Sequence, residues 1–143
     1  MPEQKLVLDD RLLIEELLGG LDRRGELHTT AYWYYRACRA AVVGAGGHLS
    51  GPFLGLDRSQ QAAAIRSLLV LRADIGLPDP RATIPVMAEL SERHPRLNLL
   101  NLEAAASARV VEATVLLSSQ ASKGILPTVL DAEGIGWEIV ELG

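Results

Sequence analysis

Residues 5–20 combine a short apolar run with a helical pattern. The run Leu6–Leu8 has no polar interruption and ends at two acids, Asp9 and Asp10. Such a run is typical of a strand that is buried on both faces of a parallel sheet. Apolar residues then recur at helical spacing until Gly19, so the segment predicts a strand followed by a helix. The apolar positions of that helix are Leu13, Ile14, Leu17, Leu18 and Leu21.

The middle of the chain predicts three helices. "AYWYYRACRAAVV" follows a cap at Thr29 or Thr30 and ends at "GAGG". A long helix follows a cap at Asp57 or Ser59 and runs to the break at "GLPDP". Thr83 with Pro85 opens the next helix, which His94-Pro95 closes. The expected buried positions are Trp33, Ala37, Ala40 and Ala41 in the first helix, and Ile65, Leu68, Leu69 and Ile75 in the second.

The last third of the chain alternates between helix and strand. "NLEAAASARVVEA" predicts a helix of small residues, and "TVLLSS" after it predicts a buried strand. "LPTVLDAEG" predicts a short helix, and "WEIVEL" predicts a last strand. We therefore expect an α/β fold with a small parallel sheet sandwiched by helices, in a single domain over residues 1–143.

Length and composition narrow the class of protein. The chain has 143 residues, of which 48% are hydrophobic, enough for the core of one domain. Its net charge of −4 argues against a protein that coats nucleic acid through bulk electrostatics. Cys38 is the only cysteine, so one chain can build neither a disulfide nor a cysteine-based zinc site. No apolar stretch reaches the ~20 residues of a membrane span, and the first residues lack a signal-peptide layout, so we expect a cytoplasmic protein without membrane contact.

Asp9 is the best-placed acid for chemistry. Ligands of open parallel sheets bind at the carboxyl ends of the strands, and Asp9 stands at such an end. Asp10 is expected to cap the following helix. An alternative for Asp9 is that it only accepts hydrogen bonds from the free amides of that helix.

Several segments in order resemble the PIN domain, the fold of the VapC-type toxin ribonucleases. They are "LVLDD" with its helix, "TTAYWYYRA", "LNLLNLEAAASARVVEATVLLSS" and the closing "GIGWEIV". The resemblance implies a nuclease that holds Mg²⁺ or Mn²⁺ between acids from the first strand, the second helix, and the late helix and strand. Hard divalent cations do prefer several oxygen ligands and activate water beside a phosphodiester.

Only one of the family's acids is matched by an acid in this chain. Asp9 matches the first-strand acid, whereas Tyr34 stands where the second-helix glutamate is expected and Asn101 where the late-helix aspartate is expected. Ser118 or Ser119 keeps a hydroxyl after the late strand, but Gln120 follows in place of an acid. Two helical positions turn a side chain through roughly 200°, so Glu103 is expected to face away from Asn101.

The resemblance and these departures imply a PIN-like domain whose metal-dependent nuclease activity is lost or weakened and which acts as a binding or regulatory module. Its partners would be a second copy, an antitoxin or another protein, and RNA through Arg36 and Arg39. The alternative is an active Mg²⁺- or Mn²⁺-dependent ribonuclease toxin that uses Asp9 with other acids. The further acids considered are Asp10, Glu15 and Glu103.

A second alternative comes from another resemblance. "LVLDDRLLIEELL" is similar to the opening of a response-regulator receiver, in which Asp9 and Asp10 would bind Mg²⁺ and Asp57 would accept phosphate. The helix-rich segments on both sides of Asp57 depart from that family's pattern. We therefore rank the receiver below the PIN-like domain.

Overall fold

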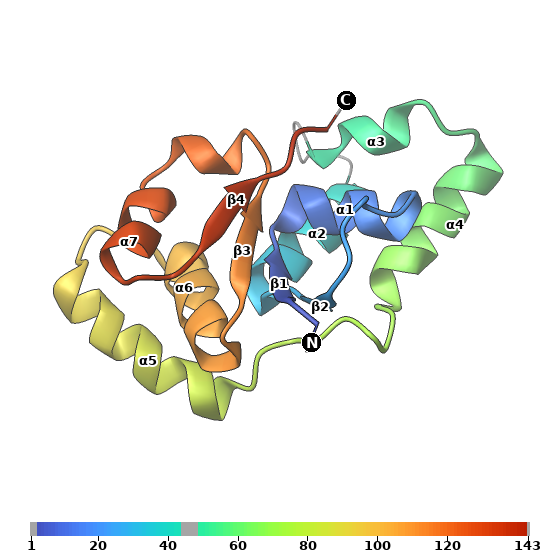
Figure 1. The fold of residues 1–143 in the computed structure, drawn as a ribbon. Coiled ribbons are helices and arrows are strands. Elements are labelled where there is room, and N and C mark those ends of the chain that lie inside the picture. Colours follow the sequence, from blue (N-terminus) through green and yellow to red (C-terminus); the bar gives the residue numbers. More distant parts are fainter. Residues whose placement is uncertain (1–2, 44–48, 143) are drawn as a thin grey trace.

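A four-stranded parallel sheet forms the centre of the computed structural model, which describes residues 3–43 and 49–142 (Figure 1). The strand order is β2-β1-β3-β4, so the two most buried strands, β1 and β3, lie side by side. Val7 of β1 is paired with Val115 of β3, and Leu8 with Leu116. The strands are β1 (Lys5–Leu8), β2 (Glu26–His28), β3 (Thr114–Leu117) and β4 (Trp137–Ile139).

Helices cover both faces of this sheet. Leu6 and Leu8 of β1 pack with α1, α2 and α4, whereas Val7 packs with α6 and α7 on the opposite face, where α5 lies against α6 (Figure 1). Because both faces are covered, the three buried residues of β1 and of β3 are all apolar, as expected for an α/β fold with a small parallel sheet between helices. The helices are α1 (Asp10–Leu18), α2 (Ala31–Val43), α3 (Gly51–Leu54), α4 (Arg58–Leu69), α5 (Pro80–Arg93), α6 (Leu99–Val111) and α7 (Leu126–Ala132), with a short 3-10 turn, η2 (Ala121–Lys123).

Most helix boundaries agree with the expectations. Gly19 ends α1, Thr30 caps α2 through a hydrogen bond from the Trp33 amide, and Asp57 caps α4 in a reciprocal capping box with Gln60. The segment "GAGG", expected to end α2, lies outside the described residues. The local capping chemistry of the sequence therefore places these starts correctly.

Two expectations in the middle of the chain are wrong. The helix after Asp57 ends at Leu69, which is half exposed, and Ile75 is buried outside any helix. After the helix, Gly76 lies beside β2, where its amide donates a hydrogen bond to the Leu27 carbonyl and its carbonyl accepts one from the Thr29 amide. β2 itself was not expected, since only one of its three residues is buried.

The helix α5 also begins earlier than the sequence predicts. Asp79 caps this helix by accepting a hydrogen bond from the Arg81 amide, and Pro80 is its first residue, where a missing N–H costs nothing. Thr83 and Pro85, expected at the start, lie inside the helix. The pair Asp79-Pro80 thus supplies the start signal.

A cluster of charged side chains connects α5, α6 and α7, which lie on the same side of the sheet as Val7. The carboxylate of Glu133, just after α7, contacts Arg93, His94 and Arg109 within 2.6–3.1 Å. These contacts hold the pKa of Glu133 well below its usual range. They join the ends of α5, α6 and α7, and α6 in turn packs against β1.

Candidate functional site

Asp9 lies directly after β1 and is fully buried. Its carboxylate accepts hydrogen bonds from neighbouring groups of the same chain. Oδ1 accepts a hydrogen bond from the Leu12 amide at 2.8 Å, which makes Asp9 the cap of α1. Oδ2 accepts from the amide and the hydroxyl of Ser118 at 2.8 and 2.7 Å. Asp9 therefore connects the end of β1, the start of α1 and the end of β3. The expectation that Asp10 would be the cap is wrong.

Asp10 is the first residue of α1, and its carboxylate is also buried. Oδ2 lies 3.0 Å from Nε of Arg36 on α2, and Oδ1 accepts a hydrogen bond from the Arg11 amide. An ion pair between the start of α1 and the second turn of α2 thus stands beside Asp9.

A small cavity of about 220 Å³ opens at this edge of the sheet. Asp10, Arg36, Asn101 and Gln120 supply its polar lining. The predicted residue Asn101 thus lies beside Asp10 and Arg36, and Gln120 joins them from the turn after β3. The other lining residues are Trp33, Leu100, Ala121 and Leu126.

Tyr34 does not belong to this arrangement. Its hydroxyl donates a hydrogen bond to the Leu68 carbonyl on α4, 2.6 Å away, on the other side of α2. The polar residue of α2 at the cavity is Arg36, two positions later, and two helical positions correspond to roughly 200° of rotation. The signal that could have found it is its spacing from Trp33, because residues three apart share a helix side.

The remaining sequence candidates lie outside the cavity lining. Ser119 is exposed and its carbonyl accepts a hydrogen bond from Ser122, so Ser118 is the hydroxyl at Asp9. Arg39 is exposed on α2, and Glu15 pairs with Arg11 on α1 at 2.7 Å.

Glu103 faces away from the cavity, in the direction expected from its spacing to Asn101. Its carboxylate accepts hydrogen bonds from the amides of Ala31 and Tyr32 at 3.1 and 2.8 Å. It thereby satisfies free amides at the start of α2, where a negative charge is favoured by the helix dipole. The role of Glu103 in this structure is to cap α2 from α6.

Burial changes the acidity of both strand-end acids. Burial, together with the neighbouring charge of Asp10, raises the pKa of Asp9 to about 6, although its hydrogen bonds act in the opposite direction. Burial also raises the pKa of Asp10, and the Arg36 guanidinium opposes that rise. Asp9 therefore holds its proton at mildly acidic pH values at which an exposed aspartate is already ionised.

These residues fit a divalent cation poorly. Mg²⁺ gives up its water reluctantly and is usually held by carboxylates. Here one carboxylate is closed by three hydrogen bonds, one is paired with a guanidinium, and the other two polar side chains are neutral amides. Within residues 3–43 and 49–142, no group of three or more His, Cys, Asp or Glu side chains is placed to hold a metal ion.

The receiver alternative meets a direct obstacle at Asp57. This residue caps α4, with Oδ1 accepting from the Gln60 amide at 2.8 Å. It follows α3 and a turn, not a strand, so it is not at the strand edge where Asp9 and Asp10 lie. The phosphoacceptor that this alternative requires is therefore absent from its expected place.

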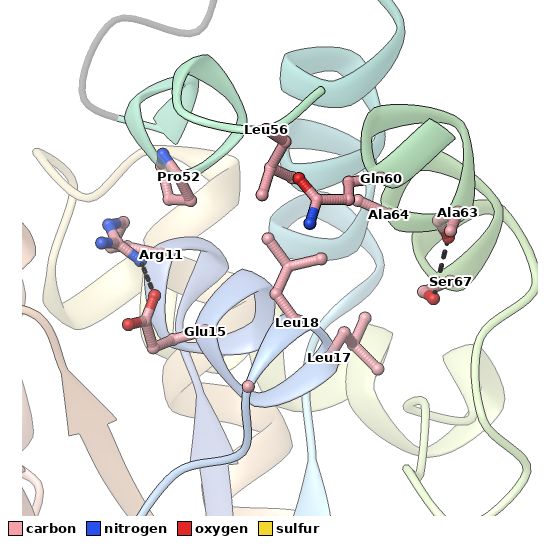
Figure 2. Close-up of a pocket in the computed structure, with 11 residues that line it drawn as sticks. Arg11, Glu15, Leu17, Leu18, Pro52, Leu56, Gln60, Ala63, Ala64 and Ser67 are labelled. Atoms are coloured by element: carbon pink, nitrogen blue, oxygen red, sulfur yellow. Dashed lines mark hydrogen bonds and ion pairs between the residues drawn. The ribbon is translucent and has the colours of Figure 1, made fainter. Parts of the chain in front are cut away.

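A second hollow lies between α1, α3 and α4. Figure 2 shows this groove, of about 550 Å³, with Leu17 and Leu18 of α1 facing Leu56 and α4, and with the Arg11–Glu15 ion pair at one side. This groove is lined by residues of α1, α3 and α4, whereas the strand-end cavity is lined by Asp10 and by residues that include those of α2 and α6. The groove is thus a separate, largely apolar surface.

Comparison with known proteins supports the α/β fold. No family model matches the chain, and neither does any curated protein. A chain in the structure of VapBC-1 from nontypeable Haemophilus influenzae is similar, with a TM-score of 0.56 and 15% sequence identity. The match covers 95% of this chain and 98% of that chain. The chain therefore has a PIN-like α/β fold. No helix in the described part of the chain is long and apolar enough to span a bilayer.

The raised pKa of Asp9 predicts a particular pH dependence of stability. Between about pH 4, the usual aspartate value, and pH 6, the folded state binds more protons than the unfolded state. The free energy of unfolding should therefore fall by up to about 3 kcal/mol as the pH rises through this window. Urea denaturation across the window should show this slope in the wild type and in Asp22→Asn, an exposed control. Asp9→Asn should show a shallower slope, because only the contribution of Asp10 then remains, and an unchanged slope in Asp9→Asn would contradict the assignment.

Proposed function

We propose that this chain is a PIN-like domain whose metal-dependent nuclease activity is lost or weakened, and that it acts as a binding or regulatory module. The observation that supports this most strongly is the closed carboxylate of Asp9. Both of its oxygens already accept hydrogen bonds, three in all, from Leu12 and Ser118. A cation ligand at this position would have to give up contacts that hold β1, α1 and β3 together.

The charges around Asp9 support the same proposal. Asp10 is neutralised by Arg36, and Asn101 and Gln120 supply amide groups without charge. A site of this kind offers Mg²⁺ little electrostatic gain to offset the loss of bound water. Binding at the cavity would instead use hydrogen bonds from a guanidinium and two amides.

The competing function is an active Mg²⁺- or Mn²⁺-dependent ribonuclease. For this function Arg36 would have to move into solvent and release Asp10, and Asp9 would have to release Ser118. The side chain of Arg36 is already 43% exposed. That rearrangement would leave two adjacent carboxylates for one cation. The ribonuclease function therefore requires metal binding that depends on Asp9 and Asp10.

A metal titration separates the two functions. We expect the wild type to show no saturable Mn²⁺ binding in the micromolar range by calorimetry. We also expect it to cleave single-stranded RNA no faster in Mn²⁺ than Asp9→Asn and Asp10→Asn do. Asp22→Asn is the matched control for charge. Micromolar Mn²⁺ binding and metal-dependent cleavage, both lost in Asp9→Asn and Asp10→Asn but kept in Asp22→Asn, would establish the ribonuclease.

For a binding module, the groove between α1, α3 and α4 is the surface we propose for a protein partner, of the antitoxin type or a second copy. Its support is the apolar lining by Leu17, Leu18 and Leu56, and the origin of the similar chain in a VapBC-1 structure. Light scattering tests the second copy first. If the groove joins two copies, the wild type is a dimer and Leu18→Lys is a monomer, whereas a dimer in both variants would exclude the groove as that interface.

RNA remains a proposed ligand without cleavage. Arg36 and Arg39 lie one turn apart on α2, and Arg36 reaches the strand-end cavity. A cytoplasmic location, where RNA and such partners are found, is part of the same proposal.

A further inference from the structure

We infer that Arg36 takes the place of the divalent cation at the end of β1, as a built-in positive charge that neutralises the acidic strand end. The inference rests on the proposed function, since it explains how this PIN-like site is stable without metal. It assigns Arg36 a purpose that its sequence position does not reveal.

The contact geometry supports this role. Nε of Arg36 lies 3.0 Å from Oδ2 of Asp10, and the Asp10 side chain is only 6% exposed. Both the guanidinium and the carboxylate therefore belong to residues that line the cavity. The other oxygen of Asp10 accepts a hydrogen bond from the Arg11 amide, so both carboxylate oxygens have a partner.

Burial favours a positive charge beside Asp10. Aspartate is almost never fully buried without a partner, and here two aspartates are buried next to each other. Asp9 is satisfied by neutral donors alone. Arg11 is engaged with Glu15, so Arg36 is the cation paired with Asp10 among the described residues.

A guanidinium and a divalent cation exclude each other here. A guanidinium donates hydrogen bonds and has no lone pair to offer a metal ion. Its charge also repels a cation a few ångströms away, and the cavity's amides from Asn101 and Gln120 cannot offset that repulsion. Replacing Arg36 with a carboxylate should therefore turn the same cavity into a metal site, with Asp10 beside the new acid.

The test compares Arg36→Glu with Arg39→Glu, a matched charge reversal three residues later on the same helix at an exposed position. Calorimetric titration with Mn²⁺ should show no saturable binding in the wild type and in Arg39→Glu. Arg36→Glu should bind Mn²⁺ at least about tenfold more tightly than Arg39→Glu. The added substitution Asp10→Asn should remove that gain.

The outcomes separate this inference from the proposed function. If Arg36→Glu binds Mn²⁺ no better than Arg39→Glu, while the wild type binds none, Arg36 is not a substitute for the cation and the proposed function stands. If the wild type itself binds Mn²⁺ in the micromolar range through Asp10, the proposed function fails and the inference fails with it.

A milder variant covers the case in which Arg36→Glu does not fold. Arg36→Met removes the positive charge without adding a negative one, and Arg39→Met is its control. We expect a lower Tm for Arg36→Met than for Arg39→Met, by about 5 °C. Mn²⁺ should recover that loss, whereas NaCl at the same ionic strength should not. Equal Tm values, or no greater response to Mn²⁺ than in Arg39→Met, would overturn the inference.

Discussion

The contact between Asp9 and Ser118 is the interaction on which the rest of the strand end depends. One carboxylate oxygen caps α1 through Leu12, and the other receives both the amide and the hydroxyl of Ser118 at the end of β3. A buried carboxylate is costly unless it is fully hydrogen-bonded, and here each bond also fixes an element of the fold. The same acid that a metal site would need is thus occupied in holding two central strands and a helix together.

This arrangement leaves Asp10 as the charge that must be balanced, and α2 supplies the balance. Arg36 forms the ion pair, and Glu103 caps the start of α2 from the side of α6. Both contacts set the position of α2 relative to the sheet. The strand-end cavity beside the ion pair is lined by these two opposite charges and by two amides, a surface suited to hydrogen bonding and poorly suited to a hard cation.

Much of the architecture was predictable because burial on both faces gives strands a continuous apolar run, as in β1 and β3. β2 escaped prediction because it is three residues long and held mainly by backbone pairing. Asp9 was expected from its place after a buried strand, and Asn101 and Ser118 from the resemblance; the structure places Asn101 at the cavity and the Ser118 hydroxyl at Asp9. The resemblance points to Tyr34, but Arg36 lies at the cavity, because a shift of two residues along a helix reverses the side that a residue faces. The Asp10–Arg36 pair depends on how α1 and α2 pack, which the spacing within either helix does not contain.

The central claim is that the strand end is complete without a metal ion. The most direct measurement is a crystal structure of the wild type grown in Mn²⁺, with anomalous diffraction recorded to locate the ion. The account predicts no anomalous peak within coordination distance of Asp9 or Asp10, and an intact Arg36–Asp10 ion pair. A Mn²⁺ ion bound by both aspartates, with Arg36 displaced into solvent, would contradict it.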